Sequence, residues 1–517
     1  MRFFLLVSYL VIGFNALPQN SPLFRDLPIG KYSVGFKIIT IADSSRVTKP
    51  LFNYFGERET GDRYQKISIH LWYPAKPNTG KGTITYNEYC YNHLFDKTSG
   101  FVDNESRSGM VKSMRNTLEG FFGKISDDDW EQLSNTKMLA QKDAAAMPEK
   151  FPLLIGTLRP LSTSVTNELM ASNGYVVAMI VSPGGRLPLG YIADVACMQR
   201  SIAYITGTGM IDENSIGAYG FSGSGFSQVL LAMSDSRIGA LADIESALYG
   251  EGIWKIFSSS NYYDASNLRV PFLHIYGKYL GLRDVSFEEF YNTKYSHRYH
   301  LLLNQSGLHH WDVATEGRAS AMILHNRGPL EPGVKASFEL ANIYLLNFFN
   351  SVLKKDKASQ RILDSRSLIK GYNDTLWTIQ HYPALRPPPD KLQFEEVIKR
   401  KGMDEAVELA RHYHKVDSAA DFVSENGLNH LAQILEEKNN LKGGIRLMKL
   451  ATEFYPDKAW LWRNMAGMQE ADGDIHGAIQ SCEQVIELLK GVGITGLSFN
   501  ERIKKSAMDT LKRLKQQ

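Results

Sequence analysis

The stretch SIGAYGFSGSGF, residues Ser215 to Phe226, decides how the rest of the chain is interpreted. An apolar run enters a group of small residues and leaves into a second apolar run, 226–232, that favours a helix. A strand that turns sharply into a helix strains the residue at the turn, and the residues two positions away must be small. With Ser222 at the apex, these flanking residues are Gly220 and Ser224. With Ser224 at the apex, one of them is a phenylalanine, whose ring would clash, so we predict that Ser222 is the exposed serine.

Apolar segments and helical segments alternate on both sides of this turn. Continuous apolar strands separated by helices are typical of a parallel sheet that is buried on both faces. A helix over 193–203 is one of the predicted separators. The predicted strands are Phe151–Ile155, Tyr175–Val181, Ile216–Tyr219, Ile238–Ile244, Pro271–Tyr276 and Tyr299–Leu303. The sequence therefore predicts an α/β fold with a mostly parallel sheet flanked by helices.

Two segments before this region have the pattern of strands. They are Tyr32–Ile41 and Lys66–Tyr73, and we expect them to form an antiparallel edge of the sheet. Residues 105–147 are predicted to be a helical insertion, in which Ser126 caps a helix that begins with three aspartates. We expect this insertion to cover a pocket or to pack on the sheet.

The chain then changes character around a proline-rich segment. Three successive prolines favour an extended, semi-rigid backbone, so we predict a linker over 381–391. The linker separates a first domain over 25–380 from a helical domain over 392–517.

The helical domain contains an internal repeat. Leu431-Ala-Gln433 recurs as Met465-Ala-Gly467, and Gly443-Gly-Ile445 recurs as Gly477-Ala-Ile479. Both pairs are offset by 34 residues (465−431 and 477−443), which is the period of tetratricopeptide repeats. We predict two or three stacked repeats and a C-terminal capping helix, with a generic helical bundle as the alternative.

Composition limits the classes of function. The 517-residue chain has a net charge of +3 and no dense basic block, which argues against nucleic-acid binding. Residues 3–12 form an apolar run of signal-peptide length, so we predict a signal peptide over 1–16 and a secreted or periplasmic protein, with a retained membrane anchor as the alternative. Cys197 and Cys482 lie in amphipathic patterns and are predicted to be buried, and no Cys/His metal spacing is present.

A serine nucleophile needs a histidine to take its proton and a carboxylate to orient that histidine. In a sheet of this kind the three residues follow the order serine, acid, histidine along the chain. The loop after the last predicted strand offers His309 and His310. For the acid we choose Glu245 at the end of the strand 238–244, ahead of Asp243, with Asp284 as a more distant alternative.

At this point the chain resembles a known family. Residues 30–350 are similar to α/β-hydrolases of the platelet-activating-factor acetylhydrolase and dienelactone hydrolase kind. The resemblance implies an acid after the strand that follows the nucleophile helix, which matches Glu245. It also implies a histidine three residues after a glycine and two before an aspartate, which favours His310. The segments that carry it are Gly30–Gly35, Phe151–Ile155, Ala171–Val177, the turn at Gly220 and the loop Gly307–Asp312.

The predicted reaction is hydrolysis of a carboxylic ester without a metal or organic cofactor. Such chemistry needs N–H donors for the oxyanion, and we assign these to Gly223 and, in a loop with an unusual sequence, to Leu158 or Arg159. The resemblance implies a short-chain or phospholipid-like ester as substrate, such as a 1-alkyl-2-acetylglycerophosphocholine. A thioesterase or peptidase remains an alternative enzyme. The alternative from another class is a degenerate hydrolase domain that acts with the tetratricopeptide-like repeats as a scaffold for a protein or peptide partner.

Overall fold

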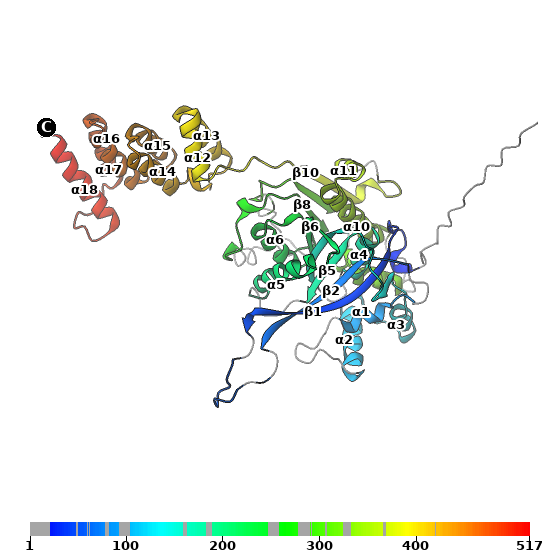
Figure 1. Cartoon of the computed structure of the whole chain (residues 1–517). Coiled ribbons are helices and arrows are strands. Elements are labelled where there is room, and N and C mark those ends of the chain that lie inside the picture. The colour runs from blue at the N-terminus through cyan, green and yellow to red at the C-terminus, as the bar shows by residue number, and fades with distance from the viewer. Residues whose placement is uncertain are drawn as a thin grey trace, which may run out of the picture. The chain divides into compact units, whose positions relative to one another are not determined.

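The computed structural model divides the chain into two compact units, Met1–Leu385 and Arg386–Gln517 (Figure 1). The boundary falls inside the segment predicted as a linker. Residues 381 and 382 of that segment, however, belong to the last strand of the sheet, so the first unit extends a little further than expected. The described residues are 21–47, 50–58, 60, 63–77, 82–92, 104–158, 163–181, 189–246, 258–277, 290, 292–305, 308–323, 332–365, 369–418 and 420–516.

The first unit is built on a ten-stranded sheet with the order β10-β9-β8-β7-β6-β4-β5-β2-β1-β3. Strands β4 to β9 pair in parallel, whereas β2 is antiparallel to β5 and to β1, and β10 is antiparallel to β9. This order, with β4 and β5 exchanged relative to the sequence, is that of the α/β-hydrolase fold. The strands are β1 (Ser33–Val47), β2 (Tyr64–Ala75), β3 (Ala140–Lys142), β4 (Phe151–Leu158), β5 (Val176–Val181), β6 (Ile211–Phe221), β7 (Ile238–Ile244), β8 (Phe272–Gly277), β9 (Arg298–Leu303) and β10 (Trp377–Tyr382).

Two strands were not predicted from the sequence. Strand β3 pairs in parallel with the first residues of β1, so the hairpin of β1 and β2 is not the edge of the sheet, contrary to the prediction. Strand β10 adds an antiparallel edge next to β9. Both gain their hydrogen bonds from strands that are distant in sequence, which a local pattern does not reveal.

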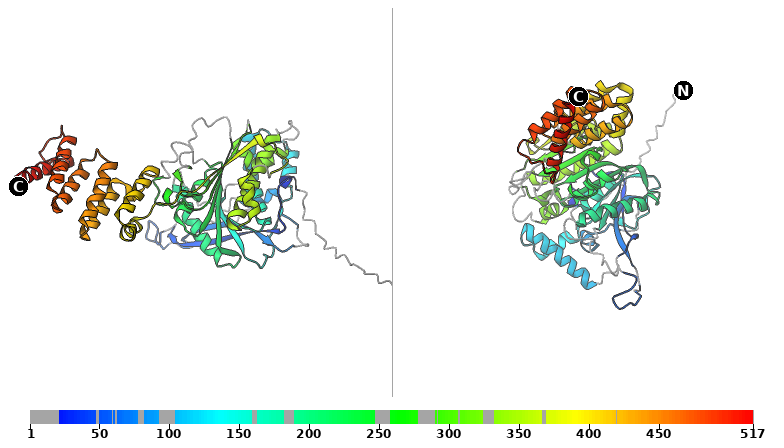
Figure 2. Two further views of the ribbon diagram at one scale, coloured as in Figure 1. Left: turned by 90° about the horizontal axis from the view of Figure 1, so that it is seen from above. Right: turned by 90° about the vertical axis from the view of Figure 1, so that its left-hand side faces the viewer.

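Helices cover both faces of the sheet (Figure 2). Apolar side chains of α5 and α6 form one core with the sheet, and those of α4, α9, α10 and the insertion form the other. Consistent with the sequence analysis, Ser126 caps α3 by accepting a hydrogen bond from the backbone N–H of Asp129. The helices are α1 (Tyr86–Asn92), α2 (Asn104–Phe122), α3 (Asp127–Ser134), α4 (Ser164–Ser172), α5 (Leu189–Thr206), α6 (Ser224–Ser234), α9 (Thr315–Ile323), α10 (Pro332–Leu353) and α11 (Lys357–Asp364).

The second unit is a series of helical hairpins. Helices α16 and α17 begin and end 34 positions after α14 and α15 (459−425 and 475−441 for their first residues), so the predicted period is present in the structure. Gly444 allows α15 to lie close to α14. A Cβ atom at this position would lie 2.9 Å from the carbonyl oxygen of Ala432 in α14. The helices are α12 (Lys391–Lys401), α13 (Met403–Val416), α14 (Glu425–Glu437), α15 (Leu441–Phe454), α16 (Ala459–Ala471), α17 (Ile475–Leu488) and α18 (Phe499–Leu514).

Helix α18 packs against α16 and α17 through an apolar cluster that includes Cys482 and Ala507. A hydrogen-bonded capping box between Ser498 and Glu501 begins this helix. In the part of the chain that the structure describes, no helix is both long enough and apolar enough to cross a bilayer.

Candidate active site

Ser222 lies at the sharp turn between β6 and α6. Its φ angle is +56°, which is unfavourable for a residue with a Cβ atom, and its side chain is partly exposed. Its backbone N–H donates to the carbonyl oxygen of Ile244 at 2.9 Å, which holds the turn on the end of β7. A Cβ atom on Gly220 would lie 2.6 Å from Oε1 of Gln228, so the turn has no room for a larger residue there.

Ser224 occupies a different environment. It is the first residue of α6 and only 1% exposed, so it packs beneath the turn instead of facing solvent. The alternative of Ser224 as the apex therefore has no support in the backbone geometry.

Glu245 is the neighbour of Ser222 across the sheet. Phe221 and Ile244 are register partners at the ends of β6 and β7, and the residues that follow them are Ser222 and Glu245. Glu245 also has a positive φ angle, +51°, and its N–H donates to the carbonyl oxygen of Ile275 at 2.8 Å. Two strained residues thus lie side by side at the carboxyl edge of the parallel strands, and such strain concentrates at functional sites.

His310 contributes its imidazole to the same place. Its Nδ1 atom lies 3.5 Å from Oε2 of Glu245, with the histidine side chain 21% exposed and the glutamate side chain 1% exposed. The imidazole ring stacks on Phe221, with a centroid separation of 4.9 Å and an interplanar angle of 30°. Because Phe221 directly precedes Ser222, these contacts bring His310 and the serine turn to the same edge of the sheet.

The other oxygen of Glu245 is held by the backbone. The N–H of Gly277, at the end of β8, donates to Oε1 of Glu245. A Cβ atom on Gly277 would lie 2.7 Å from this oxygen and 2.5 Å from Cδ2 of Leu308. Gly277 therefore fixes the position of the Glu245 carboxyl group, and the sequence analysis did not identify this contact. The one available signal was a glycine at the end of a strand, which is common to many turns.

Burial raises the pKa of Glu245 to about 8. The Gly277 hydrogen bond and the charge of His274 act in the opposite direction, because both favour the ionised carboxylate. The carboxyl group is thus in a site where gain or loss of its proton falls near neutral pH.

His309, the alternative base, is exposed and lies next to a structural turn. Its backbone N–H donates to Oδ2 of Asp312 at 2.6 Å, and the backbone N–H of Asp312 donates to the His309 carbonyl oxygen. The aspartate two positions after His310 therefore stabilises the loop that carries the histidine.

Asp243, the alternative acid, is fully buried and has other partners. It is hydrogen bonded to Nδ1 of His274, its register partner on β8, and accepts a 2.6 Å hydrogen bond from Oγ of Ser246. His300 on β9 is the register partner of His274, so Asp243, His274 and His300 form a row across three adjacent strands. No sequence pattern indicated this row, because register between distant strands cannot be read from one sequence. Asp284, the remaining alternative, lies outside the described residues.

The candidate oxyanion donors are only partly described. Gly223 is the N-cap of α6, and the first turn of a helix leaves backbone N–H groups without partners inside the helix. Leu158 is the last residue of β4, at the carboxyl edge, and the loop residues 159–162 lie outside the described residues.

Cysteines and metal-binding side chains were the other reactive groups considered in the sequence. Cys197 and Cys482 are free and buried, as predicted. In the described ranges, no group of three or more His, Cys, Asp and Glu side chains has the arrangement of a metal site.

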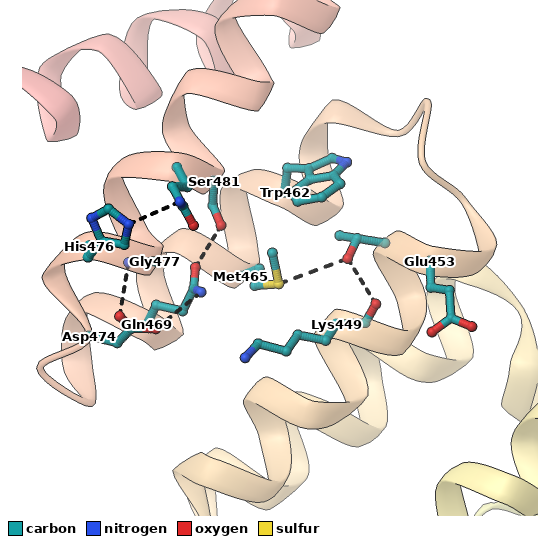
Figure 3. A pocket seen from close by; sticks show the side chains of 11 residues that line it. Lys449, Glu453, Trp462, Met465, Gln469, Asp474, His476, Gly477 and Ser481 are labelled. Atoms are coloured by element: carbon teal, nitrogen blue, oxygen red, sulfur yellow. Dashed lines mark hydrogen bonds between the residues drawn. The ribbon is translucent and has the colours of Figure 1, made fainter.

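A separate hollow lies in the repeat unit, between α15, α16 and α17 (Figure 3). Its volume is about 470 Å³, and Lys449, Glu453, Trp462 and His476 are among the residues around it. A buried hydrogen bond of 2.6 Å from Oγ of Ser481 to Oε1 of Gln469 connects α17 and α16 in its lining.

No protein-family model matches the sequence, and no curated protein matches it significantly. Among solved structures, a ferulic acid esterase from Streptomyces cinnamoneus matches 68% of this chain and 97% of its own length. The TM-score is 0.41 and the sequence identity is 17%. The fold assignment itself follows from the strand order and directions described above.

Proposed function

We propose that the first unit is a serine hydrolase of carboxylic esters. The observation that carries the proposal is the pair of Glu245 and His310 beside the strained turn of Ser222. An acid, an imidazole and a hydroxyl group at one edge of the sheet are the groups required for acyl transfer.

In the proposed reaction, Oγ of Ser222 attacks the acyl carbon while Nε2 of His310 accepts the hydroxyl proton. The carbon–oxygen bond of the ester then breaks, and the proton passes from His310 to the leaving alcohol. Water then attacks the acyl carbon of the acyl-enzyme while His310 accepts a proton from the water. The bond from the acyl carbon to Oγ of Ser222 breaks, and His310 returns the proton to Oγ. Glu245 stabilises the imidazolium, and the N–H of Gly223 stabilises the oxyanion.

The substrate proposed from the family resemblance is a short-chain or phospholipid-like ester. Hydrolysis of p-nitrophenyl esters of increasing acyl length would define the acyl pocket. Higher kcat/KM on the shorter esters is the expected result, and a preference for thioesters or peptides over all of them would contradict the ester assignment.

Labelling with a fluorophosphonate probe tests the nucleophile. We expect wild type and Ser224→Ala to be labelled and Ser222→Ala to remain unlabelled. The Ser224 variant is the matched control because it changes the other serine of the same turn. A folded wild-type protein that does not react with the probe would contradict the proposal.

A second proposed function concerns the repeat unit. We propose that its repeats are of the tetratricopeptide kind and bind a protein or peptide partner, with the hollow at Trp462 as a contact point. Lys449 supports this, because it is exposed on the rim and forms no ion pair with the residues that the structure describes. An ammonium group and an indole ring around the same hollow suit a peptide that combines an acidic and an apolar side chain.

Peptide display on the immobilised full-length chain would test this second function. Selected peptides should lose binding to Trp462→Ala and to Lys449→Ala but keep binding to Ser222→Ala. Peptides that bind all variants equally would place the binding surface elsewhere and contradict the proposal.

Export of the protein is also a proposal, because residues 1–16 lie outside the described residues. N-terminal sequencing of the protein recovered from a secretion-competent host would test it. Loss of the apolar run 3–12 is expected, and an intact N-terminus in the cytosolic fraction would contradict it.

A further inference from the structure

The hairpin of β1 and β2 extends beyond the rest of the sheet. Strand β2 pairs with β5 only over Ile69–Trp72, so residues 64–68 pair with β1 alone. The extension is held near the end of β1, where the guanidinium of Arg46 contacts the carbonyl oxygen of Ala193 and Sγ of Cys197 in α5 at 3.4 and 3.5 Å. Figures 1 and 2 show this hairpin, in dark blue, reaching past the body of the first unit.

The register shows on which side of the sheet the hairpin leaves. Ile69 is opposite Ile180 near the end of β5, and Trp72 is opposite Val177 near its beginning. Residues before Ile69 therefore continue past the carboxyl end of β5. This is the edge at which Ser222 and Glu245 lie.

The tip of the hairpin presents large apolar side chains to solvent. Tyr54 is fully exposed, Phe55 is 88% exposed, and Leu51 and Phe52 are also exposed. Asn53 fixes their arrangement, because its Oδ1 atom accepts hydrogen bonds from the N–H groups of Phe55 and Glu57 at 2.9 and 3.0 Å. Exposed apolar side chains gathered at one tip mark a site of interaction.

The shape of the tip favours a bilayer over a folded protein partner. A stable protein interface buries roughly 800 Å² on each partner, which needs a broad surface. A two-stranded tip is too narrow to supply that area. An apolar tip with Tyr and Phe needs only to enter the boundary between head groups and acyl chains, where aromatic side chains are favourable.

The charges near the tip fit an anionic lipid surface. Arg58 is the bridge partner of Phe52, is exposed, and forms no ion pair with any described residue. Residues 46–66 contain five Lys and Arg and three Asp and Glu, so this part of the sequence has a net positive charge. Basic residues close to a membrane surface are attracted to anionic head groups.

We propose that residues 50–58 form a lipid-surface anchor, in which Tyr54 and Phe55 enter the bilayer and Arg58 lies at the head groups. Because the hairpin leaves the sheet at the edge that carries Ser222, the anchor tethers the chain to the bilayer from the catalytic edge. This consequence rests on the proposed hydrolase function and identifies the substrate class as esters of lipids held in a membrane.

Vesicle flotation of the full-length chain tests the anchor. We expect wild type to float with phosphatidylcholine vesicles that contain phosphatidylglycerol and to bind less well to phosphatidylcholine alone. The double variant Tyr54→Ser/Phe55→Ser should partition roughly tenfold or more weakly. Arg58→Glu should reduce binding only to the anionic vesicles, and added salt should have the same effect.

The matched control is Leu497→Ser/Phe499→Ser, which removes apolar residues of 85% and 54% exposure from the second unit. It should float like wild type, as should Ser222→Ala, which separates lipid binding from catalysis. All variants outside the active site should hydrolyse a water-soluble ester at the wild-type rate. Flotation of Tyr54→Ser/Phe55→Ser at the wild-type level, or failure of wild type to bind either vesicle, would overturn the anchor whatever the enzyme activity.

Discussion

Nδ1 of His310 lies 3.5 Å from Oε2 of Glu245, and the Gly277 N–H fixes the other oxygen of that carboxyl group. The glutamate thus has one oxygen tied to the sheet and one directed at the imidazole. In a hydrolase the protonation of this pair decides whether Nε2, the nitrogen left for the serine, carries a hydrogen.

Activity should rise as the pH passes through about 8, the value to which burial raises the pKa of Glu245. Below this pH the carboxyl group keeps its proton and donates a hydrogen bond through its O–H to Nδ1 of His310. The Nε2 atom then carries a hydrogen and cannot accept the proton of Ser222. Above it, the carboxylate accepts from Nδ1–H and leaves Nε2 free to act as a base. The pH profile of kcat/KM measures this change.

Glu245→Gln should lower kcat by roughly 10³- to 10⁴-fold and remove the rise near pH 8, because the amide favours the wrong tautomer. Glu213→Gln, which changes an exposed glutamate of β6, is the control and should behave like wild type. Full activity of Glu245→Gln would show that another acid orients the histidine.

Gly277→Ala should displace Glu245, since the new Cβ atom would lie 2.7 Å from Oε1. We expect kcat/KM to fall at least roughly tenfold and the free energy of unfolding to fall by about 1–3 kcal/mol. Kinetics and chemical denaturation measure the two effects. At Gly239 a new Cβ atom would have its nearest neighbour 3.6 Å away, so Gly239→Ala should change the active site little. Equal activity of the two variants would argue against the positioning role of Gly277.

Ser222→Gly should be more stable than Ser222→Ala by about 1 kcal/mol, although neither variant has a nucleophile. The reason is the φ angle of +56°, which glycine adopts without strain and alanine does not. The free energies of unfolding of the two variants, from denaturant titrations, provide the comparison. If they are equal, the turn at Ser222 is not strained.

His300 should make the first unit sensitive to acid. Burial, together with the neighbouring His274, lowers the pKa of His300 to about 3. Between pH 6.5 and 3 the unfolded chain therefore binds more protons than the folded one, so stability is lost as the pH falls. From this group alone the loss by about pH 4.5 is on the order of 2 kcal/mol.

His300→Phe should flatten the acid side of the stability profile, since the ring of His300 lies among aromatic neighbours, 5.1 Å from His274 and 5.4 Å from Phe290. Urea denaturation at about pH 7 and about pH 4.5 measures the difference. His476→Gln, at an exposed histidine of the second unit, is the control and should retain the wild-type slope. An unchanged slope in His300→Phe would assign the acid sensitivity to other groups.

Neighbouring residues were enough to predict the local elements. The strand of residues 238–244 was predicted with its observed ends, and the helix cap at Ser126 and the 34-residue period of the second unit are present in the structure. These features depend on neighbouring residues: on hydrophobic periodicity, on one side chain that binds its own helix, and on a pattern that repeats along the chain.

The pairing of residues on different strands became known from the folded sheet. The sequence offered both Glu245 and Asp243 as strand-end acids, and the sheet pairs Asp243 with His274 and leaves Glu245 facing His310. It also placed Gly277 against the Glu245 carboxyl group and β10 beside β9. Register between distant strands follows from the packing of the whole sheet, so no local stretch of residues records it.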